Sequence, residues 1–66
     1  MRYFNTTKTN IGVAHVTIES HGQWQTGIII NFDHHGEVIQ KIECTFAADC
    51  LPDQVIDHLV LQINAS

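Results

Sequence analysis

The fold is decided by residues 19–37, which read ESHGQWQTGIIINFDHHGE. Two short segments in this stretch, Ser20–Gly22 and His34–Gly36, end on glycine, the residue that adopts positive φ without steric cost. Three-residue hairpin loops commonly consist of a type I turn followed by one residue of positive φ. We therefore expect two β-hairpins that share residues 23–33 as their common strand.

These two loops also predict which side chains lie on the same face of the sheet. The first places Ile18 opposite Trp24, and the second places Trp24 opposite Phe46. A slip of one residue would exchange the two faces, so the agreement of both loops favours this register. The face that it makes apolar consists of Phe4, Val16, Ile18, Trp24, Ile28, Ile30, Ile42 and Phe46.

The two ends of the chain complete the fold. A third loop at Lys8–Asn10 predicts a first strand over residues 2–7, with a plain loop as the alternative. After residue 46 the apolar period becomes helical, and Pro52 suits the first position of a helix over residues 52–64. We expect one α+β domain over residues 1–66. It is an antiparallel meander of four strands, or three if residues 2–7 are a loop, with one C-terminal amphipathic helix packed on the apolar face.

One helix covers one face of a sheet, so the other face is left for contacts. In this register four aliphatic side chains lie there, towards the end that holds the His34–Gly36 loop. They are Ile11, Val13, Ile29 and Ile39. An exposed apolar cluster is typical of a surface that binds a partner or a second copy of the chain. The alternative is ordinary scattered apolar surface.

The predicted helix offers a second candidate surface. Asp53 and Asp57, four residues apart, share one flank of it, and Leu61 lies in the same polar arc. We interpret these residues as an acidic ridge with an apolar anchor that fits a basic partner surface. A solvated helix start favoured by the helix dipole is the alternative.

Charge and composition exclude some classes of function. Lys and Arg number 3 against 7 Asp and Glu, and this net charge of −4 opposes direct nucleic-acid binding. No apolar segment approaches membrane-spanning length, and no secretory leader is recognisable, so we expect a cytoplasmic protein without membrane contact. Cys44 and Cys50 are then reduced thiols, although a single bridge between them fits an oxidising compartment.

Residues that carry chemistry do not converge in this register. His34 and His35 stand beside Asp33, but a metal site needs three or four ligands at one point. His15 faces Glu43 across the sheet on an open surface, which favours a polar contact over acid–base catalysis. We expect no catalytic residues, no metal and no cofactor.

The function class that the sequence favours is a non-catalytic module that acts by occupying a partner's surface. Its size and acidity match those of phage-encoded inhibitors of host defence, including anti-CRISPR proteins, and this analogy concerns size and charge alone. One alternative is a small homodimeric structural or regulatory subunit that pairs through its open sheet face. Another is a metal or redox accessory protein that uses His34, His35, Cys44 and Cys50.

Overall fold

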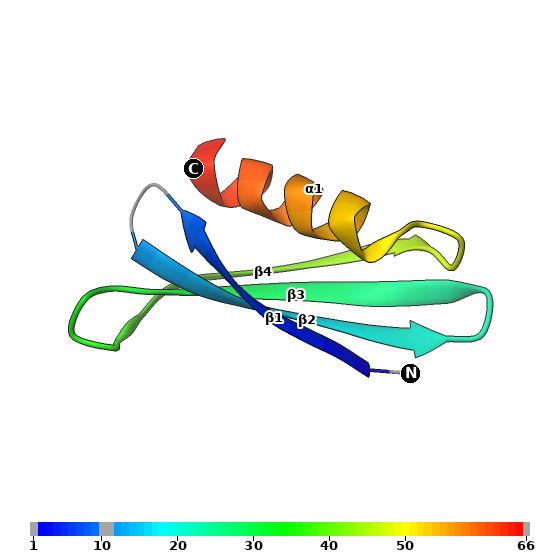
Figure 1. Ribbon diagram of the computed structural model, residues 1–66, viewed down its shortest axis with the longest axis horizontal. Helices are drawn as coiled ribbons and strands as arrows, with labels where there is room; N and C mark the ends of the chain where they lie inside the picture. Colours follow the sequence, from blue (N-terminus) through cyan, green and yellow to red (C-terminus); the bar gives the residue numbers. More distant parts are fainter. Residues whose placement is uncertain (1, 10–11, 66) are drawn as a thin grey trace.

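The computed structural model describes residues 2–9 and 12–65, which form four antiparallel strands followed by one helix. The elements are β1 (Arg2–Thr9), β2 (Gly12–His21), β3 (Trp24–Phe32), β4 (Val38–Ala47) and α1 (Pro52–Ala65). The strands lie side by side in chain order, and α1 packs on one face of the sheet (Figure 1). The predicted α+β meander is confirmed, including its first strand and its C-terminal helix.

The helix begins where the sequence predicts, because local backbone chemistry sets its first turn. The carbonyl of Leu51 accepts hydrogen bonds from the backbone N–H groups of Gln54 (3.0 Å) and Val55 (3.2 Å). In return the backbone N–H of Leu51 donates to Oε1 of Gln54 at 3.0 Å. This reciprocal arrangement resembles a capping box, and Pro52 follows at the position that needs no N–H donor.

The core lies between α1 and the face of the sheet beneath it. Its fully or almost fully buried apolar side chains are Ala14, Val16, Ile18, Ile29, Val55, Leu59 and Ile63. Gly27 lies under the helix: a Cβ atom there would come within 2.7 Å of Cγ1 of Val55 and 3.1 Å of Cδ1 of Leu59. The absence of a side chain at Gly27 therefore lets α1 approach the sheet closely.

The hairpin between β2 and β3 differs from the prediction. Its turn is the two-residue segment Gly22-Gln23, flanked by the pair His21 and Trp24, and not the predicted three-residue loop Ser20–Gly22. Gly22 does adopt positive φ (75°), but at the first position of the turn, which is the position of glycine in a type II′ turn.

The different turn exchanges the faces of β3. Val16 pairs with Ile29, three residues further along β3 than the predicted partner Thr26, and an odd shift turns every side chain of a strand over. The same happens in β1, where Phe4 pairs with Thr17 and not with Ala14. The predicted loop Lys8–Asn10 extends outside the described residues, but the pairing of Thr9 with Gly12 excludes its register.

The hairpin between β3 and β4 confirms the predicted loop. Gly36 has a φ of 84°, the backbone N–H of Asp33 donates to the carbonyl of Glu37 at 2.9 Å, and Phe32 pairs with Val38. Oδ1 of Asp33 also accepts hydrogen bonds from the N–H groups of His35 (2.9 Å) and Glu37 (3.0 Å), which stabilise the turn.

A β-bulge then changes the register of β4. Asn31 pairs with Gln40, so Ile39 is an extra residue without a cross-strand partner, and Ile29 pairs with Ile42. The bulge turns β4 over relative to β3, which compensates for the turn-over of β3 relative to β2. As a result the predicted core positions on β2 and β4 are confirmed, whereas those on β1 and β3 are wrong. The wrong ones, which lie on the opposite face, are Phe4, Trp24, Ile28 and Ile30.

Candidate functional site

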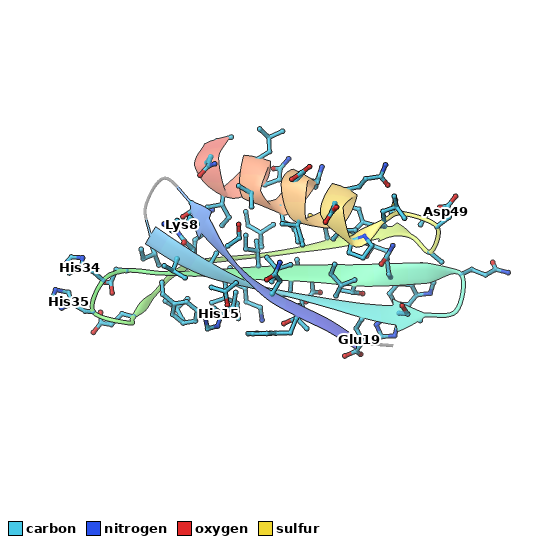
Figure 2. The ribbon with its side chains drawn as sticks, viewed as in Figure 1. Lys8, His15, Glu19, His34, His35 and Asp49 are labelled. Atoms are coloured by element: carbon cyan, nitrogen blue, oxygen red, sulfur yellow. The ribbon has the colours of Figure 1, made fainter. Side chains whose placement is uncertain are left out.

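The sheet surface opposite α1 is the candidate functional site, and we call it the open face. No described element lies on it, and Figure 2 shows His15 and Glu19 directed to the side away from the helix. Strand pairing assigns to it Phe4, Thr6, Lys8, Val13, His15, Thr17, Glu19, His21, Trp24, Thr26, Ile28, Ile30, Phe32, Val38, Lys41, Glu43, Thr45 and Ala47.

Large apolar side chains are exposed on the open face. Phe4 is 61% exposed, Val38 59% and Trp24 46%. Val13 is also exposed, whereas Ile28, Ile30 and Phe32 between them are half-buried by their neighbours. Exposed apolar side chains of the open face therefore come from all four strands and remain accessible to solvent.

The centre of this surface comes from three consecutive isoleucines on β3. Side chains alternate along a strand, so Ile29 is buried under α1 while Ile28 and Ile30 lie on the open face. A continuous apolar run is typical of strands that are covered on both faces of a sheet. In this chain α1 covers only one of the two.

A chain of ring contacts fixes one end of the open face. The imidazole of His15 lies between two aromatic rings, with centroid distances of 5.4 Å to Phe4 and 5.0 Å to Phe32. The three side chains come from β1, β2 and β3, so the contacts cross three strands. The predicted contact of His15 with Glu43 is wrong, because the shifted register places His15 opposite Ile30 and Glu43 opposite Ile28.

A second aromatic pair lies at the other end, beside the β2–β3 turn. The rings of His21 and Trp24 stack with centroids 4.5 Å apart and an angle of 26° between their planes. Nε2 of His21 also lies 3.5 Å from Oε1 of Glu19. The stacked pair holds the indole flat against its neighbour and leaves about half of it accessible.

The charged side chains described on the open face balance in sign. Lys41 neighbours Ile30, and Glu43 neighbours Ile28, both on the edge strand β4. Lys8 and Glu19 lie near the opposite edge, on β1 and β2. The centre of the open face is therefore apolar and its periphery carries charges of both signs.

The residues predicted as the apolar cluster do not come together. Val13 is exposed on the open face, and Ile39 is exposed at the bulge beside it. Ile29 is wrong as a surface residue, because the exchanged register buries it completely against α1. Ile11 lies outside the described residues. Sequence reasoning missed the actual centre, Ile28 and Ile30, although the uninterrupted isoleucine run was its signal.

The residues predicted as an acidic ridge lie together on α1. Asp53, Asp57 and Leu61 follow one another at intervals of four along the helix, and all three are exposed, Leu61 by 65%. Leu51, directly before the helix, is also exposed. This line faces away from the open face, on the opposite side of the molecule.

The histidines and cysteines do not converge. The rings of His34 and His35 lie beside each other at the tip of the β3–β4 loop, with centroids 4.2 Å apart and planes tilted by 42°, at the end of the molecule opposite Asp49 (Figure 2). Cys44 and Cys50 are half-buried free thiols that pack against the core. Residues 2–9 and 12–65 contain no cluster of three His, Cys, Asp or Glu suited to a metal ion, and no pocket.

Two further findings concern the chain as a whole. Within its described part, no helix has both the length and the hydropathy that crossing a bilayer requires. No protein-family model matches the sequence, and no similar characterised protein or solved structure was found.

Proposed function

We propose that this chain is a non-catalytic protein-binding module that acts by covering a surface of its partner, and that it binds through the open face. The observation that supports this proposal is the exposure of Phe4, Trp24 and Val38 on a sheet face over which no described element lies. Exposed apolar side chains gathered on one face, with charged residues around them, are typical of binding surfaces.

The exposed rings are large enough to act as anchors. A fully covered Phe or Trp buries about 150–250 Å², and each Å² of apolar surface removed from water contributes about 25 cal/mol. Covering the exposed part of Phe4 or Trp24 therefore contributes about 2–3 kcal/mol each. Contributions of that size are typical of the few residues that dominate an interface.

The contacts within the open face favour binding without rearrangement. His15 holds Phe4 and Phe32 in one group, and the stack with His21 orients Trp24. Side chains that are already ordered lose less conformational entropy when a partner covers them.

The exposed line of Asp53, Asp57 and Leu61 on α1 offers a second contact for a partner with a basic surface. Complementary charge raises the rate of encounter more than the final affinity. Inhibition of host defence by a phage-encoded protein, as by anti-CRISPR proteins, is one form that such surface occupation takes. It remains a prediction from size and charge.

A matched pair of variants tests the proposed surface. Ile28→Lys places one lysine at the centre of the open face, and Leu51→Lys makes the same change at an exposed position directly before α1, outside both proposed contacts. Immobilised wild-type chain and both variants are compared for the proteins they retain from the source cell. We expect Leu51→Lys to retain the wild-type partner and Ile28→Lys to lose it. Equal retention by both variants would contradict binding through the open face.

A further inference from the structure

We infer that the occupant of the open face is a second copy of this chain, related by a two-fold axis that stacks the two open faces against each other. This inference rests on the proposed function and names its partner. Two sheets stacked in this way form a sandwich about 10 Å thick between the sheets, with α1 of each copy on the outside.

The first argument comes from β3, whose isoleucines need cover on both faces of the sheet. α1 buries Ile29, whereas Ile28 and Ile30 reach the open face. An uninterrupted apolar run is typical of strands that are covered on both faces of a sheet. A second copy supplies this cover whenever the chain is present, without requiring any other protein.

The second argument is the arrangement of apolar and charged residues. Surfaces that bind other proteins transiently are about as apolar as the rest of the surface, whereas interfaces between identical copies are more apolar at their centre. The open face has Ile28 and Ile30 at its centre and Lys41 and Glu43 on its edge strand. This is the distribution expected of contact between copies.

The third argument is that a single two-fold axis brings isoleucines of the two copies into contact and also places opposite charges over each other. Ile30 pairs with Lys41, and Ile28 pairs with Glu43, in two neighbouring rows of the sheet. A two-fold axis that runs across the strands between these rows brings Ile30 of one copy over Ile28 of the other. The same axis brings Lys41 over Glu43, twice in the dimer, because a two-fold contact is reciprocal.

The net negative charge of the chain does not oppose this contact. Lys8 and Lys41 balance Glu19 and Glu43 among the described side chains of the open face. The exposed carboxylates of Asp53 and Asp57 lie on α1, on the other side of the sheet. In the dimer they are directed outward and away from each other.

The area of the open face is sufficient for a small dimer. Nine residues at about 3.3 Å each and four strands at a spacing of about 4.8 Å give a flat area of roughly 550 Å². Two stacked faces therefore bury roughly 1,100 Å², and side chains that protrude from the flat sheets add to this area. A specific interface needs about 1,000 Å² or more.

The mass in solution tests the inference. By light scattering at high micromolar concentration, we expect the wild-type chain to have the mass of two copies, twice 7.4 kDa. Ile28→Lys and Ile30→Glu are each expected to halve it, since both bury a charge in the contact. Within one copy, Lys at 28 lies opposite Glu43 and Glu at 30 lies opposite Lys41, so the fold accommodates both. Leu61→Lys, the control, keeps the mass of two copies.

A charge exchange tests the position of the axis. Lys41→Glu and Glu43→Lys each place like charges over one another and are expected to weaken association several-fold, whereas the double variant restores it. Equal weakening in the double variant and the single ones would overturn this axis. In a mixed sample of labelled and unlabelled chains, filtered NOEs should join Ile28 of one copy to Ile30 of the other. This measurement needs no variant, and the absence of such NOEs would also overturn the axis.

The outcomes for the second copy and for the proposed function are separable. A wild-type mass of one chain overturns the inferred dimer. A mass of two chains in both Ile28→Lys and Ile30→Glu, each with native circular dichroism, also overturns it. Neither result decides whether another protein binds the open face. That question is answered by the retention experiment with Ile28→Lys and Leu51→Lys.

Discussion

The two faces of the sheet are similarly apolar, yet the helix covers only one of them. The covered face carries Val16 and Ile29, whereas the open face carries Ile28, Ile30 and the ring of Phe4. The hydrophobic effect is non-directional, so it does not favour packing of the helix on one of these faces over the other.

Steric fit makes the choice. The covered face has Gly27 beneath the helix, and there is no room for a Cβ atom between Gly27 and the side chains of Val55 and Leu59. The corresponding central positions of the open face, Ile28 and Ile30, carry branched side chains, which would keep a helix packed there further from the sheet. The comparison indicates that, of two similarly apolar faces, the helix packs on the one that allows it to approach the sheet more closely.

The covered face also contains buried amides that stabilise its two ends. Nε2 of Gln25 donates to the carbonyls of Ala47 (2.7 Å) and Cys50 (2.9 Å), which ties β3 to the segment before the helix. At the other end Oγ1 of Thr9 donates to Oδ1 of Asn31 at 3.0 Å, while Nδ2 of Asn31 is buried without a hydrogen-bond partner. In a single copy of the chain, polar groups on the open face need no such partners, because water reaches them.

The largest expected effect is the difference in stability between a lysine placed on the covered face and one placed on the open face. Ile29→Lys buries an ammonium group in the core at a cost of about 5 kcal/mol or more, comparable to the whole stability of a domain this small. Ile28→Lys, one residue away, leaves the chain folded. Far-UV circular dichroism and thermal melting of both variants check this. A folded Ile29→Lys together with an unfolded Ile28→Lys would reverse the assignment of the two faces.

A methyl group at Gly27 tests whether close approach selects the covered face. In Gly27→Ala the new Cβ meets Val55, so we expect a loss of about 2–3 kcal/mol in the free energy of unfolding. Gly22→Ala is the control: nothing lies within 4 Å, and only the strain of positive φ, about 1 kcal/mol, remains. Urea denaturation at one protein concentration measures both, and equal losses would argue against steric selection.

The smallest expected effect concerns the cap that holds α1 over the covered face. Gln54→Ala removes the acceptor of the Leu51 N–H, with an expected loss of about 1 kcal/mol. Gln54→Glu keeps an acceptor at the same place and should retain the wild-type stability within about 0.5 kcal/mol. Amide exchange at Leu51 reports on the cap directly. Unchanged exchange in Gln54→Ala would show that the side chain does not protect this group.

Some features were predictable because they depend on local chemistry. Pro52 at the first helical position and the positive φ of Gly36 both appear where the sequence places them. The register was not predictable in this way. Because Ile28, Ile29 and Ile30 are consecutive, either register places isoleucine on the face that the helix covers. The agreement between the two predicted loops therefore did not distinguish the two registers.

The candidate site was predictable only in outline. That one face of the sheet remains open follows from the presence of a single helix, and Val13 is on it as expected. The prediction placed Ile29 on that face, towards the His34–Gly36 loop, because it assumed a three-residue turn at Ser20–Gly22. The exposure of Asp53 and Leu61 on α1 follows from helical periodicity alone.

By itself the sequence determined the order of the elements, the position of the helix start and the loop at Gly36, since each depends on backbone preferences of a few adjacent residues. Only the tertiary structure decided which isoleucines of β3 meet the helix. That decision depends on the distance between Gly27 and Val55, which are far apart in the sequence and come together only when α1 packs on the sheet.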